Sequence, residues 1–119
     1  NDADPPHPDV YHSYANTSNI IIYGVTATDA LTRSRGIAMT VGADNVAIVN
    51  ATVNAGGGAG MVFQFGGDVT NMLVKDSSFT GSAQFYTSWA GQTYTYRDVV
   101  VDNTTFSQSP GTPPGVIYR

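Results

Sequence analysis

Apolar and polar residues alternate in four short segments of the chain, and the segments align without gaps. They read SNIIIYGVTATD from residue 18, DNVAIVNATVNA from 44, TNMLVKDSSFTG from 70 and RDVVVDNTTFSQ from 97. Their second residues, Asn19, Asn45, Asn71 and Asp98, follow one another in steps of 26, 26 and 27 residues. A repeat this regular predicts a solenoid whose coils stack on one another.

Each copy contains two strands joined by a bend. The period of two assigns the inward face of the first strand to the pairs Ile20/Ile22, Val46/Ile48, Met72/Val74 and Val99/Val101. The second strand turns inward the residues Ala27, Val53, Phe79 and Phe106. The bend between the strands falls at Gly24, Asn50, Asp76 and Asn103, residue types that accept the left-handed backbone of a sharp turn.

A third strand lies between successive copies. Its predicted inward sets are Val10/His12/Tyr14, Ile37/Met39/Val41, Met61/Phe63/Phe65 and Phe85/Thr87/Trp89. Val and Ile number 19 against two Leu and no Glu, which favours an all-β chain. Parallel crossovers are nearly always right-handed. We therefore predict a right-handed parallel β-helix of about four coils, with ~26 residues per coil, that forms a single domain over residues 1–119.

The copies SNIIIYGVTATD, DNVAIVNATVNA and RDVVVDNTTFSQ resemble coils of the pectate-lyase-like right-handed β-helix superfamily. The resemblance covers about residues 7 to 108. That superfamily includes polysaccharide lyases, uronate epimerases, glycosidases, phage tailspikes and non-catalytic surface proteins, so the resemblance implies the fold more strongly than any one activity. It also implies a secreted or cell-surface protein whose partner is a polysaccharide.

The pattern starts close to the first residue, shows no capping segment, and begins a partial fifth coil at residue 115. Uncapped coils expose unpaired backbone groups and invite association. We expect either a segment of a longer helix or self-association through the end coils.

Enzymes of this superfamily work over the outer face of such a third strand, so its outward residues are the candidate site. The first coil offers His7, Asp9 and Tyr11, and later coils offer Ala38, Val62, Gln64 and Tyr86. A loop with Arg33 and Arg35 and a loop with Tyr94 and Tyr96 are expected to flank this face.

The run DPPHPDVYH from Asp4 loosely resembles the Asp-Pro-His run of mannuronan epimerases. The resemblance implies that His7 and Tyr11 exchange the proton at C5 of a uronate and that Asp9 orients His7. Arg33 and Arg35 would neutralise the uronate carboxylate, and Gln64 and Tyr86 would contact the sugar. The lead hypothesis is thus a lyase or epimerase acting on a uronate-containing glycan, although enzymatic activity itself stays uncertain.

Other interpretations stay open. The same face could belong to a non-catalytic solenoid, such as an adhesin, a tailspike or a carbohydrate-binding module. A glycoside hydrolase is disfavoured, because it needs two carboxyl groups and only Asp9 lies on this face. His12, in an inward column, is expected to be structural. An ice-binding face is a further, weaker alternative, based on the outward ladders Thr26/Thr28, Thr52/Asn54, Ser78/Thr80 and Thr105/Ser107.

Charge and composition narrow the partners. The net charge of −4 and the pI near 4.6, without any basic run, predict no nucleic-acid partner. The apolar runs are too short to span a bilayer, so no membrane partner is predicted. The chain has no Cys, and no cofactor or metal is predicted beyond a calcium ion that Asp2 and Asp4 leave open.

Overall fold

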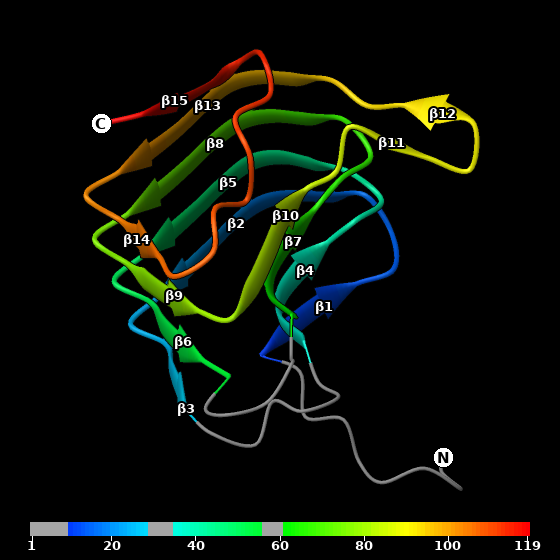
Figure 1. Ribbon diagram of the computed structural model, residues 1–119. Helices are drawn as coiled ribbons and strands as arrows, with labels where there is room; N and C mark the ends of the chain where they lie inside the picture. Colours follow the sequence, from blue (N-terminus) through cyan, green and yellow to red (C-terminus); the bar gives the residue numbers. More distant parts are fainter. Residues whose placement is uncertain (1–9, 29–34, 56–60) are drawn as a thin grey trace, which may run out of the picture.

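The computed structural model describes residues 10–28, 35–55 and 61–119, and within them it contains strands and turns but no helix (Figure 1). Three parallel sheets form the walls of a solenoid. The first sheet contains β1 (Tyr11–Ser13), β4 (Arg35–Met39), β7 (Met61–Phe65) and β10 (Ser82–Phe85). The second contains β2 (Thr17–Tyr23), β5 (Ala43–Val49), β8 (Val69–Lys75), β13 (Tyr96–Asp102) and β15 (Val116–Tyr118). The third contains β3 (Thr26–Thr28), β6 (Thr52–Asn54), β9 (Ser78–Thr80) and β14 (Thr105–Phe106).

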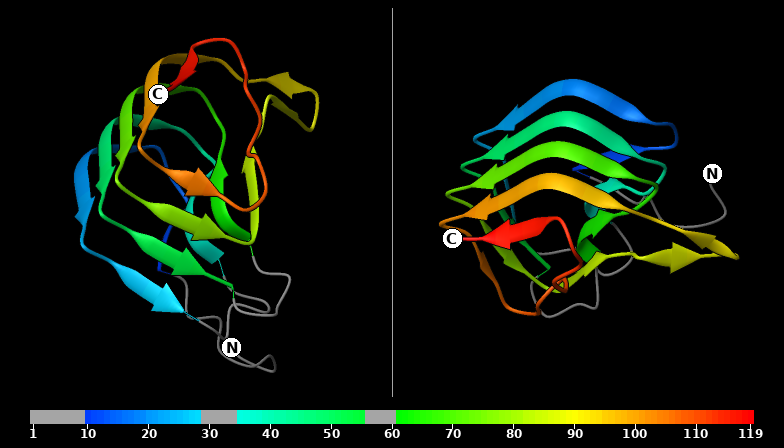
Figure 2. Two further views of the ribbon diagram at one scale, coloured as in Figure 1. Left: turned by 60° about the vertical axis from the view of Figure 1, so that its left-hand side comes forward. Right: turned by 90° about the horizontal axis from the view of Figure 1, so that it is seen from above.

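The strand register confirms the predicted repeat. Thr17 pairs with Ala43, Ala43 with Val69, and Val69 with Tyr96, so that each turn takes 26 or 27 residues. The structure has about three turns, where we predicted about four coils. The difference arises because four copies of one strand enclose only three complete steps around the axis. The stacked turns are visible in both views of Figure 2.

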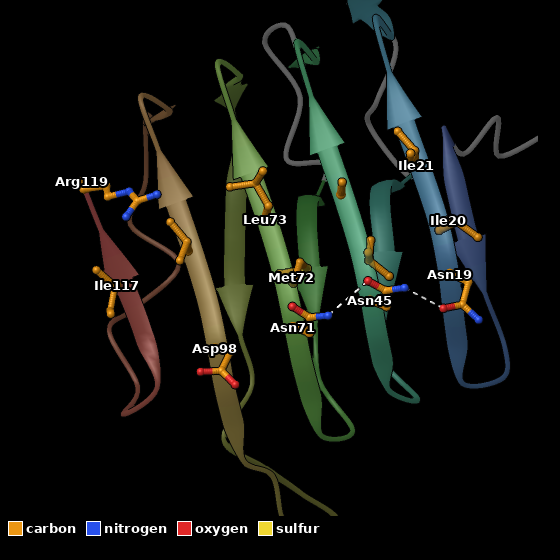
Figure 3. A pocket seen from close by; sticks show the side chains of 13 residues that line it. Asn19, Ile20, Ile21, Asn45, Asn71, Met72, Leu73, Asp98, Ile117 and Arg119 are labelled. Atoms are coloured by element: carbon orange, nitrogen blue, oxygen red, sulfur yellow. Dashed lines mark hydrogen bonds between the residues drawn. The ribbon is translucent and has the colours of Figure 1, made fainter.

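Each turn of the solenoid bends at two positions where a residue has a left-handed backbone conformation, and these positions stack into two columns. The predicted column Gly24, Asn50, Asp76 and Asn103 has positive φ angles throughout, and Asn103 Nδ2 donates to Asp76 Oδ1 at 2.7 Å. The second column was not predicted as a bend. Its members lie inside the long strands of the second sheet and are Asn19, Asn45, Asn71 and Asp98. Their amides form a ladder in which Asn45 donates to Asn19 at 2.7 Å and Asn71 donates to Asn45 at 3.1 Å (Figure 3).

Aromatic rings fill the later turns of the core. Phe63 is fully buried and packs against four other Phe rings at centroid distances of 4.6 to 5.2 Å. Its partners are Phe65, Phe79, Phe85 and Phe106. Phe79 and Phe106 stack at 5.2 Å across successive turns, as the predicted inward column requires. The wide, apolar interior makes the walls rigid supports for side chains on their outer faces.

A proline-rich segment, residues 107–115, crosses the carboxy-terminal end of the solenoid between β14 and β15 (Figure 1). Pro110 and Pro113 are buried, and the carbonyl oxygen of Pro110 accepts from the Phe85 amide at 2.8 Å. The prediction that no segment caps the coils stays a prediction at this end, because β15 lies at the edge of the second sheet. Because proline has no amide hydrogen, the segment pairs with β10 without continuing the ladder outward.

Candidate functional site

A β-hairpin interrupts the solenoid after β10. Strands β11 (Ser88–Trp89) and β12 (Gln92–Thr93) pair antiparallel and project beyond the stacked turns (Figure 1). Ala90 and Gly91 join them, with φ angles of 52° and 83°. Two positive φ angles are typical of the tight hairpin turn whose twist matches that of the strands. The hairpin carries Trp89 to the surface, where 66% of the residue is exposed.

The hairpin forms one wall of a hollow of about 480 Å³, which we call the aromatic groove. The floor is the outer face of the first sheet, near the carboxyl ends of β4 and β7. The lining residues are His12, Thr40, Val41, Gln64, Gly67, Tyr86, Trp89, Gln92 and Tyr94. Volume and composition are those of a small-molecule site, with several rings and a few polar groups.

Tyr86 is held at both ends in this groove. Gln64 Nε2 donates to its hydroxyl oxygen at 2.9 Å, and the hydroxyl of Tyr96 donates to its carbonyl oxygen at 2.6 Å. The rings of Tyr86 and Trp89 meet edge to face at a centroid distance of 6.0 Å. The two aromatic side chains therefore form a preorganised surface.

Gln64 also carries an enclosed acceptor. Its Oε1 atom is buried and has no hydrogen-bond partner among the described residues. Native structures seldom leave such an atom unpaired, because the loss costs about 1–3 kcal/mol.

Tyr94 completes the wall on the other side of the hairpin. Its amide donates to the carbonyl oxygen of Thr87 at 2.9 Å. A Cβ atom added to Gly66 would lie 3.4 Å from the Tyr94 ring, so the ring rests against bare backbone at this glycine. The Tyr94 ring therefore lies beside the backbone of the floor at Gly66.

Tyr96 lies inside the solenoid, not in a flanking loop as predicted. It opens β13, is buried, and packs against Phe85 at 5.2 Å. Its hydroxyl lies within hydrogen-bond distance of two carbonyl oxygens, those of Phe65 at 3.1 Å and Tyr86 at 2.6 Å. Burial raises the pKa of the Tyr96 phenol, and the neighbouring Tyr94 adds to this increase. The neutral hydroxyl is therefore the form that supports the groove.

The predicted facing of the first strand was wrong by one residue. Tyr11 pairs with Ile37 and packs against the core, whereas His12 pairs with Ala38 and lines the aromatic groove. The outward prediction for Tyr11 and the inward prediction for His12 are both corrected. His12 contacts Tyr14 at a ring distance of 4.2 Å.

Irregular pairing also moves other predicted residues. Val62 was predicted to face outward but is buried, because a register shift between β7 and β10 lets both Val62 and Phe63 reach the core. Thr87 and Trp89 were predicted to face inward but are exposed, since the chain leaves the wall after Phe85 to form the hairpin.

The predicted site residues divide into two groups. Gln64 and Tyr86 lie together in the aromatic groove. His7, Asp9 and Arg33 lie outside the described residues, as do the candidate calcium ligands Asp2 and Asp4.

Arg35 begins β4 and pairs with Met61, at the opposite end of the strand from the groove. Sequence reasoning missed His12, Gln92 and the exposed position of Trp89. The Ala90-Gly91 pair, which lies between Trp89 and Gln92, was the available signal for the hairpin.

A second hollow, of about 590 Å³, lies on the outer face of the second sheet (Figure 3). Its floor is an outward apolar column that includes Ile21, Leu73 and Ile117, and the Asn ladder runs beside it. It is shallow and has no aromatic ring among its lining residues. The aromatic groove therefore offers the more specific set of contacts.

The hydroxyl-bearing ladder of the third sheet is in the predicted register, with Thr26, Thr52, Ser78 and Thr105 aligned. Ice binding by this ladder stays a prediction. Among the described residues, no three His, Asp or Glu side chains gather as a metal site would require. The same residues include no helix that is long and apolar enough to cross a membrane.

No family model, no curated protein and no solved structure matches this chain. The parallel β-solenoid is shown by the strand pairing itself.

Proposed function

We propose that this solenoid binds a carbohydrate chain in the aromatic groove. The observation that carries the proposal is the exposed Trp89 ring, placed edge to face against Tyr86, whose two ends are fixed by Gln64 and Tyr96. Because the Trp89 ring lies largely at the surface, its apolar area contributes little hydrophobic stabilisation to the free protein. Exposed aromatic side chains beside polar groups mark binding sites.

The chemistry of the groove suits a sugar. The faces of a pyranose ring carry C–H groups that pack on an aromatic ring, whereas its edge carries hydroxyl groups. Trp89 and Tyr94 offer the rings, and the amides of Gln64 and Gln92 offer both donors and acceptors. Because the supporting hydrogen bonds already fix Tyr86, little conformational entropy is lost on binding.

Binding without hydrolysis is the form that the groove favours. A glycoside hydrolase places two carboxyl groups on either side of the scissile bond. Within the described part of the chain, no Asp lines the aromatic groove, and the sequence has no Glu. Lyase or epimerase activity through His7 remains a prediction, which is tested by incubation with alginate and pectate and by following unsaturated products.

Trp89 is the only Trp in the chain, so the protein carries its own reporter. We expect titration with oligosaccharides to give a saturable change in Trp fluorescence for at least one of them. The Tyr23→Ala variant is the matched control, because Tyr23 is an exposed aromatic residue on the second sheet, away from the groove. If no glycan from a broad panel alters the emission or the heat of mixing of the folded protein, the proposal is wrong.

A further inference from the structure

The aromatic groove continues into a second, more polar hollow of about 830 Å³, which we call the polar groove. The two share Val41, Gly67, Gln92 and Tyr94. The polar groove adds the lining residues Asn16, Gly42, Ala43, Asp44, Asp68, Thr70 and Thr93. A ligand longer than one or two sugar rings would therefore meet both hollows in succession.

Bare backbone forms the passage between the two grooves. Gly67 has a φ angle of 68°, and a Cβ atom added to it would lie 2.4 Å from the Gly42 amide nitrogen. At Gly42 an added Cβ would lie 2.5 Å from Asn16 Oδ1, the end of a side chain that can shift more readily than backbone. Neighbouring turns thus touch through glycines, and neither position raises a side chain between the hollows.

Acidic groups face the polar groove. Asp44 Oδ1 accepts from the Thr70 hydroxyl at 2.6 Å, and Asp68 Oδ1 accepts from the Thr95 amide at 2.9 Å. The second oxygen of each carboxylate accepts no hydrogen bond from the described residues. Both side chains are exposed, so these oxygens can accept hydrogen bonds from the hydroxyl groups of a sugar.

Among the described residues, no Lys or Arg lines the aromatic groove or the polar groove. On the neighbouring strand β13, Arg97 pairs with Thr70, which itself lines the polar groove. A polyuronate would bring a carboxylate on every sugar toward Asp44 and Asp68 without a lining cation to neutralise it. Like charges repel, and because both carboxylates are exposed the repulsion is strongest at low salt.

We propose that the ligand is an uncharged polysaccharide chain that packs in the aromatic groove and crosses Gly67 into the polar groove. There Asp44 and Asp68 accept hydrogen bonds from its hydroxyl groups, and the same two carboxylates discriminate against polyuronates. This inference rests on the proposed carbohydrate binding and sets its substrate class. It favours a neutral chain over the uronate-containing glycan expected from the sequence, and that glycan stays a prediction.

Matched pairs of oligosaccharides test the inference, because the two members of a pair differ only at C6, where one carries a carboxylate and the other a neutral group. The probes are β-1,4-linked glucose and glucuronate hexasaccharides, and methyl-esterified and free α-1,4-linked galacturonate hexasaccharides. At low salt we expect the neutral member of a pair to bind about tenfold more tightly or better. Added salt should narrow the difference, because it screens only the charged ligand's repulsion.

The Asp44→Asn variant provides a second test of the inference. Asn retains an oxygen that can accept from Thr70, so the variant is expected to fold. It should bind the acidic hexasaccharides several-fold more tightly than the wild-type protein does. Asp102→Asn is the matched control, since it removes the same charge from β13 outside both linings.

The outcomes separate the two proposals. If acidic members bind as tightly as their neutral partners, or if Asp44→Asn leaves their affinity unchanged, the inference of a neutral ligand fails while carbohydrate binding stands. If no member of either pair and no other glycan binds, both proposals fail.

Discussion

The hydroxyl of Tyr96 donates a hydrogen bond to the carbonyl oxygen of Tyr86 at 2.6 Å, which links a buried residue of the second sheet to the wall of the aromatic groove. The same hydroxyl lies 3.1 Å from the carbonyl oxygen of Phe65 in the first sheet. One phenol thus ties two walls of the solenoid together at the base of the hairpin. Its position explains how an exposed hairpin can present Trp89 in a fixed orientation.

Tyr96→Phe removes this link and keeps the ring that packs against Phe85. We expect the free energy of unfolding to fall by about 1–3 kcal/mol, because a buried carbonyl loses its donor. Urea denaturation measures the change. Tyr23→Phe, which removes an exposed hydroxyl, is the control and should be neutral. Equal stability of the two variants would contradict the role given to the Tyr96 hydroxyl.

Alkaline pH should weaken the fold through the same group. Burial raises the pKa of Tyr96 in the folded protein above the value of about 10 for an exposed tyrosine. The stabilisation is therefore fully present below about pH 10 and is lost as the pH rises toward the folded-state pKa. Burial also raises the pKa of Tyr118, to about 12, which acts in the same direction.

The measurement is the urea midpoint between about pH 8 and 11, chosen to bracket the unfolded-state pKa. Wild type should lose stability more steeply than Tyr96→Phe, which has no phenol to ionise at this position. Parallel curves for the two proteins would show that Tyr96 does not control the alkaline limb.

Trp89→Ala should separate binding from folding. Because the ring is 66% exposed, its removal is expected to change stability by less than about 0.5 kcal/mol. Affinity for a neutral oligosaccharide should fall about tenfold or more, as expected for a central aromatic contact. Titration calorimetry provides the readout, since the variant has no Trp. A variant that binds like Tyr23→Ala would exclude Trp89 from the site.

Two glycines with similar backbone angles should respond differently to alanine. Gly67 and Gly91 have φ angles of 68° and 83°, and each substitution carries the strain of a left-handed alanine, about 1–2 kcal/mol. Gly91 has nothing within 4 Å of an added Cβ, whereas at Gly67 that atom would lie 2.4 Å from backbone atoms. Thermal unfolding should show that Gly67→Ala lowers the free energy of unfolding by at least about 2 kcal/mol more than Gly91→Ala does.

Sequence periodicity was sufficient for the solenoid, the length of its turns and the inward columns of the second and third sheets. Ile48, Val53 and Phe79 are fully or almost fully buried, as their parity predicted. Asn50 and Asp76 have the left-handed backbone that their residue types suggested. These features follow from local rules, because a period of two and a preference for a turn are properties of neighbouring residues.

Only the tertiary structure showed which side chains of the first sheet face the core and which face outward. Alternation along a strand predicts which side chains face inward only once the facing of one residue is known. A single extra residue in the strand exchanges its inner and outer faces. In β1, the pairing of Tyr11 with Ile37 and of His12 with Ala38 places Tyr11 against the core and His12 in the groove. Only the pairing of β7 with β10 reveals why Val62 is buried.

The amino-acid sequence by itself therefore determined the repeating frame of this protein, and the tertiary structure decided what that frame presents. Trp89 and Tyr86 become neighbours of Gln64 because the chain leaves the wall in a hairpin, and the returning Tyr96 is drawn into the core. The groove joins residues from separate turns. Their meeting depends on contacts across the stack, which no local pattern of residues encodes.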